Sequence, residues 1–260
     1  MKNVLSITTV FLLVLSFNNF VYADGHNKEL PNVANVQVNV CKLNDGVTMD
    51  QYEVVTQDYV SWSKKNNVET FYVRHFPVFS HATTGRPLSY DFLEILGSTH
   101  DTSGEAWDLW LGTKEGQKLN NRWQQAANCY PKMGTGITLF SDEKALAEAD
   151  QRAVTWNWCS LNEGVSAEEV IAKHADMAKN LEGNDQGIVG WAGIIPRLGK
   201  GSAPGDFAHI IIFEDIKGVM KHQKTIAQGG WKHYRDYEKH FATCKGEQLY
   251  TAEVLNRLPQ

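Results

Sequence analysis

The sequence contains none of the short motifs that identify the common enzyme classes. It has no P-loop, no dinucleotide-binding fingerprint, no nucleophile elbow and no H-E-x-x-H element. It also lacks a cluster of lysine and arginine, and its net charge is −5. A mildly acidic chain has no electrostatic attraction for a phosphate backbone, so nucleic acid is not an expected partner. Hydrolase and nicotinamide-dependent activities likewise have no support in the sequence.

Long apolar runs are scarce as well, and the most prominent one lies at the start of the chain. It covers Val4 to Phe17, follows the basic Lys2, and is followed by Val21-Tyr22-Ala23. This pattern predicts a signal peptide over residues 1–23 and an exported, periplasmic or secreted protein. The run is short for a membrane span, which disfavours the alternative of an uncleaved anchor. Removal of Lys2 changes the net charge from −5 to −6, and no membrane association is expected afterwards.

Cysteine is rare, with only four residues: Cys41, Cys129, Cys159 and Cys244. An even number of cysteines in an exported protein suggests disulfides. Four cysteines allow three pairings, and composition does not choose among them. A four-cysteine metal site is disfavoured because no C-x-x-C spacing is present.

An internal repeat is the strongest positive signal. Segments Cys41–Asp50 and Cys159–Glu168 are identical at five of ten positions and conservatively exchanged at three more, with an offset of 118. Further on the offset is 115, in the pairs Asp91-Phe92 with Asp206-Phe207 and Cys129 with Cys244. Self-similarity over this length predicts a duplicated domain rather than an array of short repeats.

Each copy has the same expected order of elements. Strands are predicted over 36–41, 69–79, 91–96 and 136–140 in the first copy, and over 154–159, 187–195, 206–213 and 248–255 in the second. A helix begins after the first strand of each copy, where Thr48 with Gln51 and Ser166 with Glu169 form capping boxes. A second helical stretch runs up to the last cysteine of each copy.

This βαββαβ order resembles the ferredoxin-like plan. We therefore expect an extension over 24–35, a first repeat over 36–140, a linker over 141–153 and a second repeat over 154–260. Helices cover only one face of each sheet, so the two bare faces must bury each other. The α+β chain thus resembles the dimeric α/β-barrel superfamily in a fused, two-copy form, with two ferredoxin-like units packed sheet to sheet. The resemblance covers most of the mature chain and rests on element order and duplication.

The resemblance implies a cavity for a small organic ligand. The superfamily includes antibiotic-biosynthesis-type monooxygenases, haem-degrading enzymes, chlorite-dismutase-like haem proteins, ring-cleavage isomerases and binding proteins. An oxygenase or isomerase is one hypothesis, a non-catalytic small-molecule or haem-binding protein is a second, and a structural or assembly protein is a third. Haem is a candidate cofactor, and homo-oligomer formation is left open. A shared fold does not choose among these functions.

The ferredoxin-like plan also selects a cysteine pairing. In it the first strand ends at the edge of the unit where the second helix ends. Cys41 is therefore expected to pair with Cys129, and Cys159 with Cys244. The sequence separations, 88 and 85, agree as a duplication requires.

Two repeat-equivalent residues are the candidate catalytic groups. Glu94 and His209 are each the lone ionisable residue of an apolar strand, at an offset of 115. Burial of such a group needs a compensating reason. One interpretation places both in a cavity shared by the two sheets, with one of them acting as general base. The alternative is a solvent-facing polar residue or a buried, hydrogen-bonded one.

Five further residues are candidate ligand-binding groups. Asn39 and Asn157 occupy equivalent places on the first strands, where they could line a cavity or face water. Arg74 and His75 point to opposite faces of one strand, and the counterpart in the second copy lies near Trp191. One of the two could reach the cavity, and an arginine there would bind an anionic group. The alternative is a surface arginine and a cross-strand histidine.

The helical stretch of the second copy carries three histidines: His222, His233 and His240. A lone helical histidine can serve as an axial haem ligand. Solvent exposure is the ordinary alternative. The corresponding loops 80–89 and 196–205 are rich in turn residues and are expected to connect strands, with a lid over the cavity mouth as a second interpretation.

Overall fold

The computed structural model describes residues 33–82, 86–181, 183 and 187–258. The expected signal peptide and most of the expected extension lie outside these residues. Within the described part, no helix is both long and apolar enough to span a bilayer.

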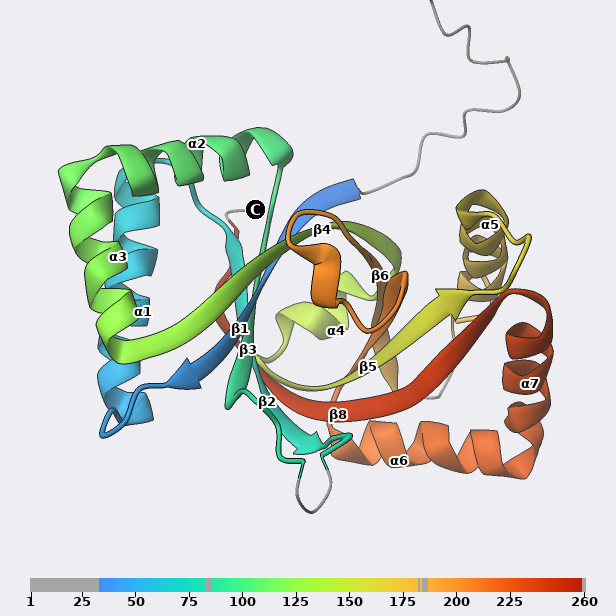
Figure 1. The fold of residues 1–260 in the computed structure, drawn as a ribbon. Coiled ribbons are helices and arrows are strands. Elements are labelled where there is room, and N and C mark those ends of the chain that lie inside the picture. Colours follow the sequence, from blue (N-terminus) through green and yellow to red (C-terminus); the bar gives the residue numbers. More distant parts are fainter. Residues whose placement is uncertain (1–32, 83–85, 182, 184–186, 259–260) are drawn as a thin grey trace, which may run out of the picture. The chain divides into compact units, whose positions relative to one another are not determined.

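The chain folds as two successive halves with the same order of elements (Figure 1). The first half contains β1 (Val33–Leu43), α1 (Met49–Lys65), β2 (Phe71–Phe79), β3 (Phe92–Ser98), α2 (His100–Gly112), α3 (Lys114–Ala126) and β4 (Ala127–Ser141). A short helix, α4 (Glu143–Ala147), leads to the second half. That half contains β5 (Gln151–Leu161), α5 (Ala167–Ala178), β6 (Ile188–Pro196), η1 (Lys200–Ser202), β7 (Phe207–Phe213), α6 (Ile216–Thr225), η2 (Ile226–Gly230), α7 (Trp231–His240) and β8 (Ala242–Asn256).

The eight strands close into one antiparallel barrel, in the order β1-β3-β2-β8-β5-β7-β6-β4. Each half contributes a ferredoxin-like sheet, β4-β1-β3-β2 or β8-β5-β7-β6. Two seams join the halves, where β2 pairs with β8 and β4 pairs with β6. The predicted fold class is therefore confirmed: two tandem ferredoxin-like units form a pseudo-dimeric α/β barrel.

The barrel interior is the largest hydrophobic core. It is built by both halves from the inward-facing side chains of the strands, including Val73, Ile95, Trp156, Ile210 and Tyr250. Burying the two bare sheet faces together removes a large apolar area from water, at roughly 25 cal/mol per Å². Smaller clusters lie between the outer face of each sheet and its own helices. The halves depend on each other for their shared core.

The residues retained in the repeat are those that build the first turn of each half. Gly46 and Gly164 both adopt a φ of +80°, a left-handed conformation that glycine enters without strain. The capping boxes at Thr48 and Ser166 are both formed. The duplicated motif therefore encodes the strand-to-helix connection.

Both predicted disulfides are present: Cys41–Cys129 and Cys159–Cys244. Their placement differs from the expectation, because Cys129 and Cys244 lie in strands rather than at helix ends. The last strand of each half begins at Ala127 or Ala242, directly after the helix. Each disulfide therefore links directly opposed residues of neighbouring antiparallel strands, with Cα–Cα distances of 4.1 and 4.0 Å. No turn residue separates helix from strand there, so nothing in the sequence marks where the last strand begins.

Candidate functional site

The polar faces of the strands point toward the helices and away from the barrel axis. Val36, Val38 and Val40 pack on the interior core, so Asn39 faces the opposite way, under the helices. The cavity expected between the two sheets is therefore not where these polar groups lie. Large side chains fill that space, and the cavities lined by the candidate residues lie between each sheet and its own helices.

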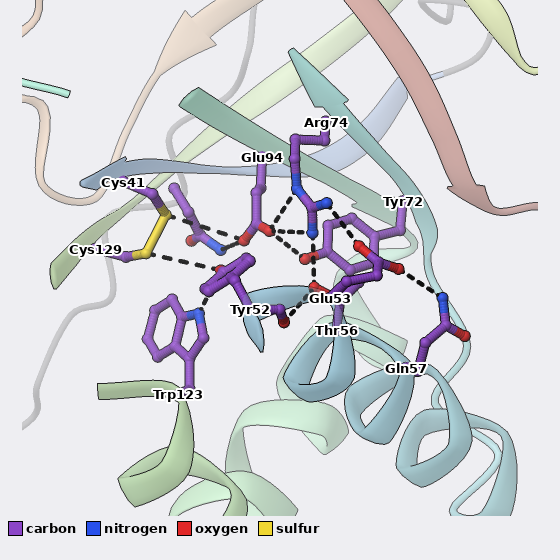
Figure 2. A network of polar contacts seen from close by, with 11 residues as sticks. Cys41, Tyr52, Glu53, Thr56, Gln57, Tyr72, Arg74, Glu94, Trp123 and Cys129 are labelled. Carbon is purple, nitrogen blue, oxygen red and sulfur yellow. Dashed lines mark hydrogen bonds and ion pairs between the residues drawn. A yellow bond between two sulfur atoms is a disulfide. The ribbon is translucent and has the colours of Figure 1, made fainter. Parts of the chain in front are cut away.

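In the first half, Glu94 is held in a dense polar network (Figure 2). The residue is 1% exposed. Its Oε1 accepts hydrogen bonds from the Tyr72 hydroxyl at 2.5 Å and from the Arg74 guanidinium at 3.2 and 3.4 Å. Its Oε2 accepts one from the Asn39 amide at 3.3 Å. The carboxylate is thus fully partnered, as a buried charge must be.

Arg74 links this carboxylate to helix α1. Its guanidinium also donates to Glu53 at 2.8 Å and to the Thr56 hydroxyl at 2.6 Å. Burial lowers the pKa of Arg74, but its neighbours Tyr72, Glu94 and Glu53 outweigh this effect and raise the pKa above its ordinary value. Arg74 is therefore engaged by protein groups at Nε, Nη1 and Nη2, and it is not among the residues that line the cavity beside Glu94.

The free space beside Glu94 is small, with a cavity of about 70 Å³. Pockets for small organic molecules are typically ~300 to 1,000 Å³. Aromatic side chains from α1, α2 and α3 occupy the rest of the space, among them Tyr59, Trp62 and Trp110. Glu94 is thus a buried, hydrogen-bonded carboxylate beside a small, aromatic-lined cavity.

The second half contains a much larger cavity, of about 590 Å³. It lies between the outer face of β5–β8 and the helices α5, α6 and α7. Its wall includes Asn157, Trp191, His209, His222, Tyr237 and Glu247. Two of the other candidate residues, Glu94 and Asn39, line the small first-half cavity instead. Glu94 and His209 therefore do not share a site, because they lie under different sets of helices.

His209 is the centre of a chain of hydrogen bonds. The Trp191 indole N–H donates to Nδ1 of His209 at 3.1 Å. The Tyr237 hydroxyl lies 3.5 Å from Nε2 of His209 and 2.7 Å from Nε2 of His174. The rings of His174 and His209 pack edge to face, 4.6 Å apart.

Burial keeps both histidines neutral. It lowers the pKa of His209 to about 4, and burial together with neighbouring His209 lowers the pKa of His174 to about 2. Because Nδ1 of His209 accepts the bond from Trp191, the proton of the neutral ring lies on Nε2. Nε2–H then donates to the Tyr237 oxygen, and the Tyr237 hydroxyl donates to His174. At neutral pH His209 thus carries a donor at Nε2 and no free lone pair there.

The strand register identifies the counterpart of Arg74, which the sequence placed near Trp191. Arg74 pairs with Glu94, whereas Gly193 pairs with His209. Gly193 is therefore the counterpart of Arg74, and Trp191 is the counterpart of Tyr72. With no arginine beside it, position 209 has no cationic partner, and the neutral imidazole suits that setting.

His75 points into the barrel interior, where it accepts the Trp156 indole N–H at 3.1 Å. It is 3% exposed, and burial lowers its pKa to about 3. Of the five residues proposed as ligand-binding groups, the structure thus brings only Asn157 and Trp191 to the large cavity.

Sequence reasoning missed several groups of the large cavity. Burial raises the pKa of Glu247 on β8, which accepts a hydrogen bond from Gln223 at 2.7 Å. Tyr237 lies on α7 among charged residues, and neither its spacing nor its surroundings marked it. A kink also escaped notice: Gly229 adopts a φ of +131° between α6 and α7, which lets the chain turn around the cavity.

His209 also lies near sulfur. One of its ring nitrogens is within 4.8 Å of the sulfurs of Cys159 and Cys244. These sulfurs are bonded to each other, so they offer no thiolate to a metal ion.

Comparisons with known proteins agree with the fold. No family model and no curated protein matches the chain by sequence. A solved structure from Lactobacillus acidophilus, described as a "putative monooxygenase", covers 87% of this chain and 99% of its own, with a TM-score of 0.53 and 9% identity. A similarly described protein of Fusobacterium nucleatum covers 87% and 96%, with a TM-score of 0.49 and 15% identity. Chlorite dismutase of Candidatus Nitrospira defluvii covers 85% and 92%, with a TM-score of 0.47 and 9% identity. At 9% identity, the Lactobacillus acidophilus structure establishes a shared fold and no shared activity.

Proposed function

We propose that the chain is an exported protein that binds a small, ring-containing organic molecule in the second-half cavity. One observation carries the proposal. The cavity of about 590 Å³ is open in the second half, whereas aromatic side chains leave about 70 Å³ in the first. Its size lies within the usual range for ligand pockets. Its wall combines apolar side chains with a few polar groups, which supports recognition of a mostly apolar ligand.

Haem is the ligand class that we propose to test first. The site would need an imidazole nitrogen for the iron, an apolar slot for the ring and a cation for the propionates. His233 on α7 lines the cavity, is exposed, and has no hydrogen bond recorded within the described part of the chain. Lys173 on α5 lies at the same cavity. The donor set therefore fits, with His233 holding the iron and Lys173 a propionate; bound haem would supply redox and oxygen chemistry.

The test is a titration of the purified protein with hemin, followed by its Soret band. We expect a saturable Soret shift that is lost in His233→Ala. His240→Ala is the matched control, because His240 lies on the same helix but bonds to Asp236. A protein that shows no shift, or a His233→Ala variant that binds as the parent does, would exclude this ligand at this residue.

A second candidate function is turnover of an oxygen-containing ring compound in the same cavity. It is favoured by the Nε2–H of His209, which could polarise a carbonyl or phenolic oxygen that replaces the Tyr237 oxygen as its acceptor. The catalytic role then differs from the general base that the sequence suggested. His209→Gln, which retains an N–H donor, should keep more ligand affinity and turnover than His209→Leu. Equal losses in the two variants would count against a donor role.

Export is the remaining part of the proposal. Two disulfides are stable in an oxidising compartment and rare in reducing ones. Expression of the full chain in a host that secretes proteins, followed by N-terminal sequencing, should give a mature protein that begins at Asp24. Retention of Met1 in the exported fraction would contradict the cleavage site.

A further inference from the structure

The small cavity of the first half has an unusual wall. Seven aromatic residues line it: Tyr52, Tyr59, Trp62, Tyr72, Trp107, Trp110 and Trp123. They come from α1, β2, α2 and α3, and several of them meet edge to face. The only carboxylate in the wall is that of Glu94. Aromatic faces carry partial negative charge, so both kinds of group favour a cation.

Three of the four indole N–H groups in the wall of this cavity, and the side-chain amides of Gln37 and Asn39, donate to protein acceptors. Trp107 donates to Gln37 at 2.9 Å, Gln37 donates to Asn39 at 2.9 Å, and Asn39 donates to Glu94 at 3.3 Å. The indoles of Trp110 and Trp123 donate to other protein oxygens. An anion would therefore find few donors here, whereas a cation needs none.

The local charge also favours a cation. Glu94 and Glu53 are both paired with the single guanidinium of Arg74, which leaves the trio with a formal charge of −1. The guanidinium carbon of Arg74 lies 5.2 Å from the ring centre of Tyr52 and 5.4 Å from that of Phe92. It is not among the residues that line the cavity. The carboxylate thus lies between the guanidinium and the open space.

Size limits the occupant. A cavity of about 70 Å³ is well below the haem-sized space of the second half. The space exceeds the roughly 10 to 15 Å³ that one water needs, so the cavity accommodates a small group of heavy atoms. A group of four or five heavy atoms, such as the trimethylammonium head of choline, has a comparable size, and the rest of such a molecule would extend toward the entrance. Gln37, Trp107 and Trp110 are only half-buried, which places the entrance on their side.

We propose that the first-half cavity binds a small methylated ammonium cation, held by aromatic ring faces and by the carboxylate of Glu94. Attraction between the ring faces and the positive charge replaces the hydration that the cation loses on entry. This site is separate from the second-half cavity, so the result of the choline experiment does not depend on whether haem binds there.

The first experiment needs no variant. The purified protein is titrated with choline and with 3,3-dimethylbutan-1-ol, which has the same shape without the charge, and tryptophan fluorescence and calorimetry report binding. Sodium chloride at matched ionic strength is the blank. We expect saturable binding of choline, at least tenfold tighter than that of the neutral alcohol. No saturable binding, or equal affinity for the two compounds, would overturn the proposal.

A pair of variants then locates the site. Trp107→Leu removes a half-buried ring from the cavity wall and should weaken choline binding at least tenfold. Trp231→Leu removes an exposed indole from the second half and should leave it unchanged. Circular dichroism and the thermal midpoint establish that both variants are folded. Choline affinity that is unaffected by Trp107→Leu would place the cation elsewhere and overturn the assignment.

Discussion

Trp191 donates its indole N–H to His209 at the place in the second half where Tyr72 donates its hydroxyl to Glu94 in the first. The register of β2 with β3 and of β6 with β7 makes these pairs equivalent. Each half thus keeps a hydrogen bond from an aromatic side chain to the one ionisable group on its third strand. The halves differ two residues further along the same strand, where the first half has Arg74 and the second half has Gly193. Because of this difference, Glu94 lies beside the guanidinium of Arg74, whereas Gly193 offers no cation to His209.

Removing the indole donor should raise the pKa of His209. The bond from Trp191 occupies the lone pair of Nδ1, which protonation would consume, so it stabilises the neutral ring. In Trp191→Phe we expect the pKa to rise from about 4 but to stay below the ordinary value of about 6.5, because burial remains. Long-range ¹H–¹⁵N NMR of the imidazole measures it. An unchanged pKa would mean that burial alone sets it.

Breaking the buried ion pair should destabilise the first half strongly. Arg74→Met leaves the carboxylate of Glu94 buried without its cation, which typically costs about 3 to 5 kcal/mol. Urea unfolding measures the change in the free energy of unfolding. Glu53→Gln is the matched control, because the Glu53 side chain is 37% exposed and water can solvate the polar groups left at that end of the ion pair. Equal losses in the two variants would argue against a dominant role for the Glu94–Arg74 contact.

Acid should weaken the barrel through His75. Its pKa is about 3 when folded and about 6.5 when unfolded. The unfolded chain therefore binds more protons between these values, and the contribution present above pH 6.5 is lost as pH falls below it. His75→Gln retains an acceptor for Trp156 and should reduce the stability lost between pH 7.5 and 5 by about 2 kcal/mol. Urea midpoints at the two pH values measure this loss.

His240 provides the control for the pH experiment. It is 50% exposed on α7, so His240→Gln serves as the surface substitution with which His75→Gln is compared. A His75→Gln variant with the same pH dependence as the parent would show that other groups govern acid unfolding.

The two capping boxes should contribute equally. Thr48 and Ser166 each accept a hydrogen bond from the backbone N–H three residues later, at 3.3 and 3.2 Å. Loss of such a cap costs about 1 kcal/mol. Thr48→Ala and Ser166→Ala should therefore each lower the free energy of unfolding by about that amount, in urea melts. A large difference between them would mean that one helix end has another source of stability.

The repeat made much of the fold predictable. The spacing from Cys41 to Asp50 and from Cys159 to Glu168 encodes a turn, a left-handed glycine and a helix cap, all of which are local. Strand alternation also correctly predicted that Arg74 and His75 point to opposite faces of one strand. Local periodicity gives the grouping of side chains but not the partner that each face meets, so the cavities were expected on the wrong side of the sheets.

The candidate site was less predictable for the same reason. Trp191 and Asn157 were identified and do line the large cavity, but Tyr237 and Glu247 come from elements whose packing no local pattern specifies. The equivalence of Arg74 with Gly193 depends on strand register, which the sequence alone left uncertain by two residues.

The amino-acid sequence by itself determined the duplication and the order of the main elements, because these follow from spacing, capping and turn chemistry within each copy. The cysteine pairing followed once that order was compared with the ferredoxin-like plan. Only the tertiary structure decided that one half is packed with aromatic rings and the other is hollow. That outcome depends on how side chains distant in sequence fill the space between sheet and helices. Such packing depends on the whole folded structure and cannot be derived from any single segment of the sequence.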